Sequence, residues 1–384
     1  MFKFCDLIEE VSEFNTDLKY GLEDIIGVTI EKGLIPTVAN LTQTALDKFY
    51  IVRPNTFIYN PRTHGVRLGM GFNETDNVYI TSWNNVAFKV KDSAKQIVLS
   101  KYLWLYFLRP DWDRLSNFLA WGSSTIVFAW KDFLDIEISL PSIEKQCEIV
   151  AEYNTLATRI ETNKKLIATL EQTAQTLYRH TFIDNIDPNN LPDGWRMGTV
   201  GDFCECNTDN ASSKDLKGVI KYLDSGSVTE NNFESLQVLD STCDEIPSRA
   251  KRKVKPNDIV YSTVRPNLRH YGLIKFDVEN VVVSTAFAVI RSVNKNISNE
   301  LVYMWLSDLK VVEALHGVAE MSKATYPSIT PDDIMNVKIP IPEQFDFSEL
   351  NNALEAIFNA SYQYLLENQT LIKMQTLLLS KMGA

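Results

Sequence analysis

The sequence lacks any apolar run near the roughly 20 residues that a helix needs to cross a bilayer. Its opening residues, MFKFCDLIEE, reach acidic side chains too early for a secretory signal peptide. We therefore expect a cytoplasmic protein without a membrane segment. Cysteine is also scarce, and among the five cysteines only Cys204 and Cys206 lie close together in the sequence. This favours ordinary reduced thiols over disulfides, while a zinc or redox role for these two cysteines is the weaker alternative.

Sequence motifs for catalysis are missing as well. No Gly-x4-Gly-Lys-Ser/Thr phosphate loop is present, so the sequence predicts no ATP-driven motor. The four histidines are scattered, and none belongs to a helical pair suited to a metal ion. Acids upstream of lysines occur only singly, as chance allows, and do not indicate a nuclease site. These absences predict a chain with no catalytic residues, no metal ion and no cofactor.

The charge is unevenly distributed along the chain. The formal net charge of −11 argues, taken alone, against nucleic-acid binding, because affinity for DNA comes largely from Lys and Arg neutralising phosphates. Between Ile246 and Lys275, however, eight Lys or Arg residues stand against one acid, Asp258. Between Lys48 and Asn73 there are four basic residues and no acid. DNA is therefore a candidate ligand of these two segments, and the acidic surplus lies elsewhere.

The chain repeats itself at an offset of about 200 residues. Residues 132–141, DFLDIEISLP, match residues 333–342, DIMNVKIPIP, 201 positions later, and we expect each to be an alternating strand ended by proline. Residues 52–59, VRPNTFIY, match residues 254–261, VKPNDIVY, at an offset of 202. A third, shorter match precedes each predicted strand. Three matches in one order at nearly one offset indicate an old duplication whose copies have diverged.

Each copy has the same plan, a mixed α+β part followed by a long helix without Pro or Gly. We expect short strands within residues 51–59, 78–90, 258–262 and 281–291, and amphipathic helices near 102–108 and 301–306. Turn formers are dense in residues 184–194 and mark the boundary between the copies. The predicted fold class is α+β, with a first domain at 1–141, a first helix at 142–183, a linker at 184–194, a second domain at 195–342 and a second helix at 343–384.

Both long helices carry a heptad seam. Seam residues recur at alternating spacings of four and three, from Ile149 to Leu177 and from Leu350 to Met382, and each seam contains one asparagine, Asn163 or Asn368. A buried Asn costs stability but fixes register, because a misaligned pairing leaves its amide unsatisfied. We expect an antiparallel coiled coil with pseudo-two-fold symmetry, with the two asparagines close together near the axis. The alternative is that each helix packs on its own domain.

Several short signatures, each weak alone, occur in a duplicated order. They are LPDGW at 191–195, YSTVRPN at 261–267, LP at 140–141 running into IEKQ at 143–146, and LEQ at 170–172 with LYRHTF at 177–182. In this order the chain resembles, over essentially its whole length, the specificity subunits of bacterial type I restriction-modification systems. The resemblance implies two target-recognition domains that each read half of a split site in double-stranded DNA. It also implies that the helices separate these domains and dock two methyltransferase subunits, which motor-nuclease subunits then join.

Basic side chains beside hydroxyl, amide and aromatic groups suit phosphate anchoring combined with readout of base edges. A solvated loop is the alternative for each of them. In the second copy we expect phosphate contacts from Lys251, Arg252, Lys253 and Lys255. We expect groove contacts from Ser262, Thr263, Arg265, Asn267, Arg269, His270, Tyr271, Lys323 and Tyr326. The counterparts in the first copy are Arg62, His64, Arg67, Ser123 and Ser124.

The second helix departs from the pattern of the first. Four extra residues separate Pro342 from Asn368, compared with the distance from Pro141 to Asn163, and the second helix has no aromatic counterpart of Tyr178 and Phe182. These differences predict two docking faces that are unequal in detail.

Two other classes of function remain open. An amino-methyltransferase would carry an Asn/Asp/Ser-Pro-Pro-aromatic motif and a glycine-rich cofactor loop, and the nearest strings, NPR at 60–62 and GVRLGMG at 65–71, fit neither. We therefore expect a non-catalytic subunit, whose target is asymmetric because its two loops differ. The alternatives are a DNA-modifying enzyme with an unrecognised active site and a structural adaptor whose basic loops are incidental.

Overall fold

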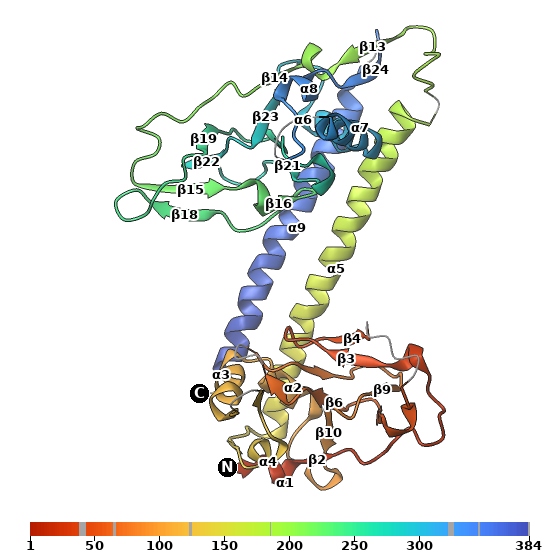
Figure 1. Ribbon diagram of the computed structural model, residues 1–384, viewed down its shortest axis with the longest axis vertical. Coiled ribbons are helices and arrows are strands. Elements are labelled where there is room, and N and C mark those ends of the chain that lie inside the picture. The colour runs from red at the N-terminus through yellow and green to blue at the C-terminus, as the bar shows by residue number, and fades with distance from the viewer. Residues whose placement is uncertain are drawn as a thin grey trace. The chain divides into compact units, whose positions relative to one another are not determined.

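The computed structural model describes residues 1–37, 44–63, 67–122, 125–184, 186–321, 326–344 and 346–382. The chain divides into two compact units (Figure 1). Unit 1 comprises Met1–Thr162 and Asn368–Ala384, and unit 2 comprises Asn163–Glu367. Each unit therefore holds one globular part and a stretch of both long helices. Among the described residues, no helix is long and apolar enough to cross a membrane.

The globular part of unit 1 is built on a four-stranded antiparallel sheet. Its strand order is β2 (Ile8–Glu10), β10 (Val86–Val90), β6 (Phe57–Tyr59) and β8 (Met70–Phe72). Four helices accompany it: α1 (Phe4–Leu7), α2 (Ser100–Phe107), α3 (Pro110–Leu119) and α4 (Trp130–Leu134). The smaller strand pairs are β1 (Phe2–Lys3) with β12 (Glu137–Ile138), β3 (Ile26–Val28) with β4 (Leu34–Pro36), β5 (Tyr50–Val52) with β9 (Tyr79–Thr81), and β7 (Arg62–Thr63) with β11 (Ile126–Val127).

Aromatic side chains fill the core of unit 1. Phe57 lies directly opposite Phe72 on one neighbouring strand and Phe88 on the other, and its ring stacks on theirs at centroid distances of 4.4 and 4.9 Å. Such cross-strand aromatic pairs stabilise a sheet beyond the burial of their area. Trp112 of α3 is 2% exposed and packs against Phe107 of α2. The helices are thereby fixed to the sheet that carries the first predicted DNA loop.

Unit 2 repeats this plan. Its sheet has the order β14 (Cys204–Cys206), β23 (Phe287–Ser292), β20 (Ile259–Ser262) and β21 (Tyr271–Leu273). Its helices are α6 (Asn299–Ser307), α7 (Leu309–Glu320) and α8 (Pro331–Met335), and β13 (Trp195–Thr199) pairs with β24 (Lys338–Pro342). Because each strand of this sheet follows its counterpart in unit 1 by about 200 residues, the duplication predicted from the sequence is confirmed in the fold.

Unit 2 has a second four-stranded sheet, whose counterpart in unit 1 consists of the pairs β3–β4 and β5–β9, linked by a parallel bridge between Ile25 and Ile80. Its order is β18 (Gln237–Asp240), β15 (Val219–Leu223), β22 (Val281–Ser284) and β19 (Ala250–Lys253). The pair β15–β22 is parallel, and a short hairpin joins β16 (Val228–Thr229) to β17 (Asn232–Phe233). This sheet carries the basic segment on β19.

The strands predicted at 132–141 and 333–342 are wrong in their first halves, where the chain forms α4 and α8 instead. In unit 2 the cause is a capping box: Thr330 Oγ1 accepts from Asp333 N at 3.2 Å, and Asp333 accepts from Thr330 N at 2.7 Å. Pro331 at the first helical position also favours the helix, because the φ angle of proline is already fixed near its helical value. The alternation of apolar residues produces strands only afterwards, at β12 and β24.

The long helices are α5 (Ile143–Phe182) and α9 (Ser348–Lys381), and they run antiparallel within each unit. In unit 2 the end of α5 meets the start of α9, because the Phe182 ring stacks on Phe347 at 5.7 Å. In unit 1 the start of α5 meets the end of α9, because Ile149 and Met382 line one apolar pocket. The described seam residues are buried or half-buried, so the heptad seam and the antiparallel pairing are confirmed. The pseudo-two-fold axis stays a prediction.

The second helix begins at Ser348, five residues later than expected. Asn163 and Asn368 each follow the first residue of their helix by 20 positions, so the four extra residues precede α9 and do not lengthen it. Asn163 is fully buried and Asn368 is 7% exposed. The Asn163 amide donates to Glu367 Oε2 at 2.9 Å. The part of the predicted asymmetry that rested on these four residues is therefore wrong.

Candidate DNA interface

The loop after β20 in unit 2 has a tightly constrained backbone. A 3-10 turn, Pro266–Leu268, lies between Arg265 and Arg269, and both arginines have left-handed backbones with φ of 49° and 57°. Non-glycine residues in this conformation cost on the order of 1–2 kcal/mol each, so the surroundings must hold them there. Thr263 does so from one side, since its N–H and its hydroxyl both donate to Ala286 O, at 2.8 and 2.9 Å. The loop is thus presented in one defined shape.

The structure brings the first predicted loop of unit 2, residues 262–271, next to Tyr326, the last residue of the second predicted loop. Arg265 N donates to Pro327 O at 2.9 Å, and Val264 pairs with Ser328 in an isolated bridge. The guanidinium of Arg265 lies 5.0 Å from the centroid of the Tyr326 ring, and that ring is 58% exposed. A stacked guanidinium is held in place while its edge stays free to donate hydrogen bonds. Arg265 and Tyr326 therefore form one surface, although 61 positions separate them in the sequence.

Unit 1 has the same arrangement. Arg62 and Thr63 of the first predicted loop form β7, and Arg62 lies opposite Val127 of β11, just after the second predicted loop. The Arg62 side chain is exposed, and Arg62 N donates to Asn60 Oδ1 at 3.0 Å. Gly122 has φ of 150°, and a Cβ there would lie 2.0 Å from Thr125 O, so this turn requires glycine. His64, Ser123, Ser124 and Lys323 lie outside the described residues.

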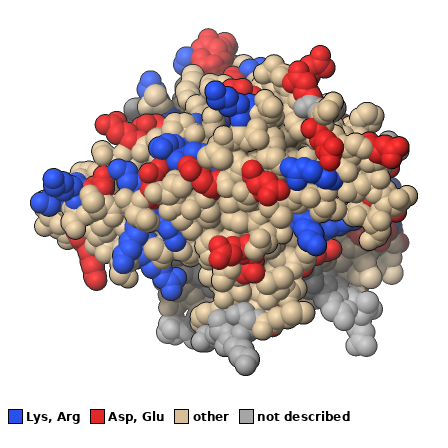
Figure 2. Space-filling model, turned by 90° about the horizontal axis from the view of Figure 1, so that it is seen from above, with Lys and Arg blue, Asp and Glu red and all other residues tan. Residues whose placement is uncertain are grey.

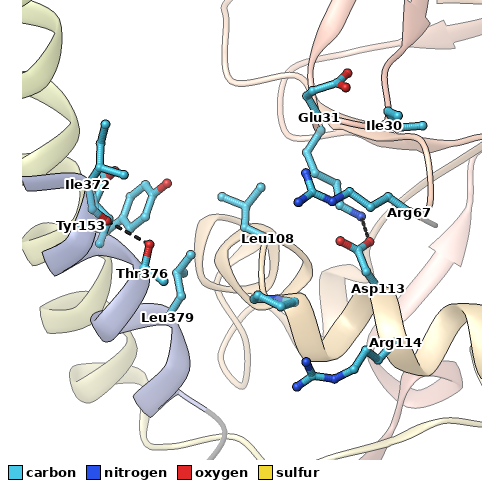
Figure 3. A pocket seen from close by; sticks show the side chains of 13 residues that line it. Ile30, Glu31, Arg67, Leu108, Asp113, Arg114, Tyr153, Ile372, Thr376 and Leu379 are labelled. Atoms are coloured by element: carbon cyan, nitrogen blue, oxygen red, sulfur yellow. Dashed lines mark hydrogen bonds and ion pairs between the residues drawn. The ribbon is translucent and has the colours of Figure 1, made fainter. Parts of the chain in front are cut away.

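Arg67 faces a different feature of unit 1, a pocket that it lines with Lys32, Asp113 and Arg114 (Figure 3). Lys32 Nζ lies 2.6 Å from Asp113 Oδ1 and donates to Leu68 O at 3.0 Å. Burial lowers the pKa of Lys32, although hydrogen bonding to Asp113 opposes this shift. Arg67 therefore adds an exposed positive charge beside a buried ion pair, apart from the pairing of β7 with β11.

Two residues of the predicted reading loop are unsuited to DNA contact in this conformation. Tyr271 is 5% exposed, because its ring stacks on Tyr261 in the core at 5.2 Å. Ser262 is 2% exposed and donates to Val264 O. For both residues the expected groove contact is corrected: Tyr271 packs in the core, and the Ser262 hydroxyl already has a hydrogen-bond partner within the chain. Thr263 is half-buried.

Arg265, Asn267 and Leu268 are the exposed residues of this loop, and Arg269 and His270 are half-buried. Arg269 forms an ion pair with Glu230, and His270 Nδ1 lies 2.7 Å from Val228 O. Both contacts join the loop to the hairpin β16–β17.

The basic segment on β19 is partly neutralised. Lys253 pairs with Asp215 at 2.7 Å, Lys255 pairs with Asp209 at 3.2 Å, and Arg252 Nη1 donates to Asn210 Oδ1. Lys251 is exposed. On the face drawn in Figure 2, Lys and Arg side chains are interspersed with Asp and Glu rather than gathered in one patch. The segment therefore presents less free positive charge than its composition suggests.

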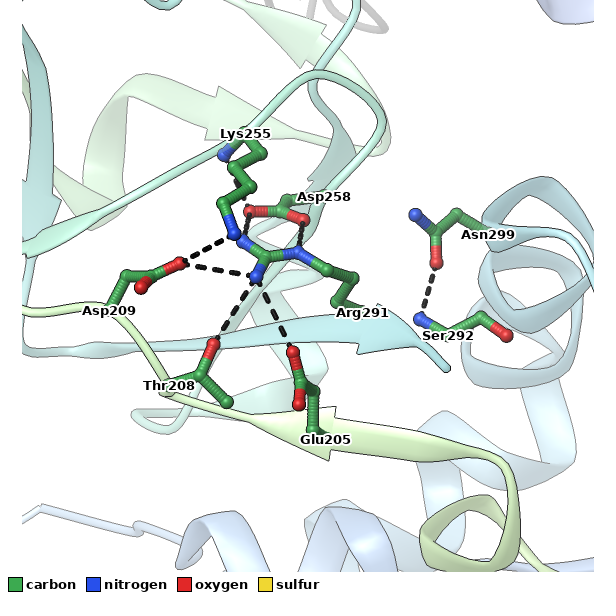
Figure 4. Close-up of polar contacts among 8 residues, drawn as sticks. All are labelled: Glu205, Thr208, Asp209, Lys255, Asp258, Arg291, Ser292 and Asn299. Carbon is green, nitrogen blue, oxygen red and sulfur yellow. Dashed lines mark hydrogen bonds and ion pairs between the residues drawn. The ribbon is translucent and has the colours of Figure 1, made fainter. Parts of the chain in front are cut away.

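A buried ion pair at the start of β20, the strand that leads into the reading loop, could not be found from the sequence (Figure 4). Asp258 is fully buried and accepts from Arg291 Nε and Nη2, both at 2.7 Å, and from Lys255 N at 2.6 Å. Arg291 Nη1 also donates to Asp209 at 3.1 Å, and this contact helps to lower the pKa of Asp209. Asp258 raises the pKa of Arg291. The network joins β14, β20 and β23 at the start of β20, the opposite end of this strand from the reading loop.

The two closely spaced cysteines lie in unit 2. Cys204 is buried and Cys206 is half-buried on β14, and burial raises the pKa of Cys204 to about 12 and that of Cys206 to about 11. Thiols with raised pKa values are poor nucleophiles and poor metal ligands at neutral pH. In the described part of the chain, no cluster of three or more His, Cys, Asp or Glu side chains could hold a metal ion.

The same family domain matches the chain twice, once in each copy. Residues 39–172 and 192–346 both match the type I restriction modification DNA specificity domain. These matches cover most of the chain, and the chain belongs to this family of DNA specificity subunits.

One curated relative and one solved structure are also type I specificity subunits. The chain is 27% identical over 150 residues to the type I restriction enzyme HindI specificity subunit of Haemophilus influenzae, a match that covers 39% of this chain and 32% of the relative. The aligned part thus spans about a third of that relative's length. The fold is similar to the crystal structure of a type I restriction-modification S subunit from M. genitalium, with a TM-score of 0.61, 15% identity, and coverage of 100% of this chain and 95% of the other.

Proposed function

We propose that this chain selects the DNA target of a type I restriction-modification enzyme, and that each unit reads one half of a split, asymmetric site in double-stranded DNA. The observation that carries this proposal is a repeated pairing, in which a loop with an exposed arginine meets the end of a second loop or the strand directly after it. The pairing occurs at Arg62 in unit 1 and at Arg265 in unit 2. Equivalent surfaces with different side chains suit the reading of two different half-sites.

The side chains on these surfaces suit base readout combined with phosphate contact. Arg is the usual bidentate partner of guanine and Asn that of adenine, so Arg62, Arg265 and Asn267 are assigned to base edges. Lys251, which is exposed on β19, is assigned to a phosphate. Lys253 and Lys255 could add phosphate contacts by leaving their ion pairs with Asp215 and Asp209. The half-buried Arg269 is assigned to holding the loop.

Partner proteins are assigned to the long helices. In unit 1, Met374 and Leu377 are 50% and 55% exposed and line an apolar pocket with Ile149 and Leu156. Exposed apolar side chains that cluster on a helix pair suit a protein contact. We assign this face to a methyltransferase subunit, a second such subunit to the corresponding face of unit 2, and motor-nuclease subunits to the assembled complex. The chain itself then reads DNA without catalysing a reaction.

The domain boundaries give the test. The reading modules are residues 1–141 and 195–342, and residues 142–183 and 343–384 act as spacer and docking helices. Replacing residues 196–331 with the second domain of another family member should change one half of the methylated sequence in the host genome and leave the other half unchanged. Change in both halves, or in neither, would contradict the assignment of one half-site to each unit.

The alternative of a structural adaptor has its own test. Arg265→Ala combined with Arg269→Ala should weaken DNA binding by the assembled complex. The matched control is Arg196→Ala, which removes a half-exposed arginine from β13. Equal affinities of the double variant and the control would favour the adaptor. Methylation or cleavage by the purified chain alone would favour an enzyme.

A further inference from the structure

Both units expose large apolar side chains where the helix after the sheet ends. In unit 1 these are Phe118 of α3 and Trp121 just beyond it, which are 84% and 75% exposed. In unit 2 the residues 200 positions later are Val318 of α7 and Met321 just beyond it, which are 44% and 87% exposed. Two exposed aromatic rings three residues apart contribute little to folding, because they remain in water. Their recurrence in both copies indicates a ligand.

In each unit the helix that ends at the tip contacts the proposed reading surface. In unit 1, Trp121 and Val127 exchange two backbone hydrogen bonds of 3.1 Å, and Val127 lies opposite Arg62. Thr63, next to Arg62, donates from Oγ1 to Asn117 Oδ1 of α3 at 3.2 Å. In unit 2, α7 packs against the 3-10 turn between Arg265 and Arg269. The tip therefore adjoins the reading loop directly in unit 1, and in unit 2 the helix that carries the tip packs against the reading loop.

We propose that these tips are apolar wedges that enter a groove of duplex DNA and press on the base pairs of each half-site, with Phe118 and Trp121 acting on one half and Val318 and Met321 on the other. The inference rests on the proposed function, because the half-sites are those read by Arg62 and Arg265. Proteins that insert apolar side chains between base steps unstack and bend the duplex, and so gain contact area and sensitivity to how easily a sequence deforms.

Duplex DNA explains the tips better than a protein partner does. The helices that end at the tips contact the reading loops, whose exposed arginines a phosphate backbone attracts. The apolar pocket assigned to a methyltransferase subunit lies on the long helices instead. Aromatic rings stack on bases, whereas aliphatic side chains chiefly fill space. The tip of unit 1 should therefore unstack its half-site more than the tip of unit 2.

The test uses the full chain assembled with its methyltransferase subunits and a duplex that carries the genomic target. Phe118→Ala combined with Trp121→Ala should weaken binding by roughly tenfold to a hundredfold, since burial of one such ring is worth about that ratio. The slope of log Kd against log salt concentration should stay unchanged, because no phosphate contact is lost. Arg265→Ala should lower the size of that slope by about one if it contacts a phosphate, and relax selectivity at one base pair if it reads a base.

Unit 2 offers a matched control on a single helix. Met321→Ala should weaken binding, whereas Leu309→Ala, which truncates a 54% exposed side chain at the other end of α7, should not. A 2-aminopurine base placed in the half-site of unit 1 should fluoresce more strongly with the unaltered complex than with the double variant, because wedging unstacks it. Thermal unfolding of each variant should match that of the unaltered chain, since the truncated side chains are exposed.

The outcomes separate the wedge from the function on which it rests. If the tip variants bind as tightly as the unaltered complex while Arg265→Ala weakens binding, the wedge is overturned and the reading function stands. If the tip variants fail to assemble with the methyltransferase subunits, the tips are protein docking surfaces and the wedge is overturned. If the unaltered complex does not prefer its genomic target over random duplex DNA, both proposals fall.

Discussion

The buried pair of Asp258 and Arg291 gives the sharpest prediction about unit 2. Asp258 is fully buried and the Arg291 side chain is 16% exposed, so both groups lose most of their water and depend on their two mutual hydrogen bonds of 2.7 Å. In Arg291→Ala the Asp258 carboxylate keeps the hydrogen bond from Lys255 N and loses both hydrogen bonds from the guanidinium. Removing one member of a buried pair costs about 3–5 kcal/mol. A domain of this size loses about 2–4 °C per kcal/mol, so the midpoint of unit 2 should fall by roughly 6–20 °C.

Differential scanning calorimetry of the full chain is the assay, with the transition of unit 2 expected to move and that of unit 1 expected to stay. Lys221→Ala is the matched control, because its pair with Asp277 is exposed and spans 3.5 Å, and such pairs contribute about 1 kcal/mol or less. Arg291→Met combined with Asp258→Leu removes both charges and should recover much of the loss. A shift for Arg291→Ala no larger than that of the control would refute the reasoning, as would a double variant with the summed loss of both single variants.

The pH dependence provides a second readout of the same network. Arg291 and Lys255 lower the pKa of Asp209 in the folded state. A carboxylate with a lowered folded pKa stabilises the fold above its unfolded pKa, and this contribution disappears as the pH falls through the folded pKa. In Arg291→Ala the pKa of Asp209 should rise toward its ordinary value of about 3.9. The stability difference between the two proteins should therefore narrow below about pH 4, and a constant difference would contradict this role of Asp209.

Three further predictions concern the rest of the molecule. At pH 8 a thiol reagent should modify the exposed Cys147 while Cys206 stays unmodified, because a pKa of about 11 leaves roughly one thiolate per thousand thiols; equal rates would contradict this. Trp112→Ala should destabilise unit 1 by about 3–5 kcal/mol in urea unfolding, because it empties a site that is 2% exposed; a loss below about 1 kcal/mol would contradict it. Asn163→Leu combined with Asn368→Leu should raise the thermal midpoint but broaden the spin-label distances between the helices; unchanged midpoint and distances would refute the register role.

The sequence predicted features that depend on pattern and order. The offset of about 200 residues identified the duplication, and the spacing of seam residues identified two helices that run antiparallel in each unit. These features succeed because periodic burial and duplicated order are written along the chain itself.

Features that depend on contacts between distant positions could not be predicted. The partner of Lys253 is Asp215, and that of Asp258 is Arg291, 38 and 33 positions away, so the basic segment looked freer in sequence than it is in space. The buried position of Tyr271 follows from the pairing of β20 with β21, which places its ring on Tyr261. An alternating pattern also hid the start of α8, where the capping by Thr330 decides the local structure.

The buried residues that form the frame of each unit are different from the exposed loop residues proposed to contact DNA. This separation would allow such a chain to change its target. Residues that set the frame, such as Phe57 and Asp258, are fully buried, and changes there cost several kcal/mol. Arg62 and Arg265 are exposed, and substitutions at exposed positions usually change stability by less than about 0.5 kcal/mol. Under the proposed function, a new base preference can therefore arise in one unit with little loss of stability. Because each unit has its own sheet and core, a change in one half-site leaves the frame of the other unaltered.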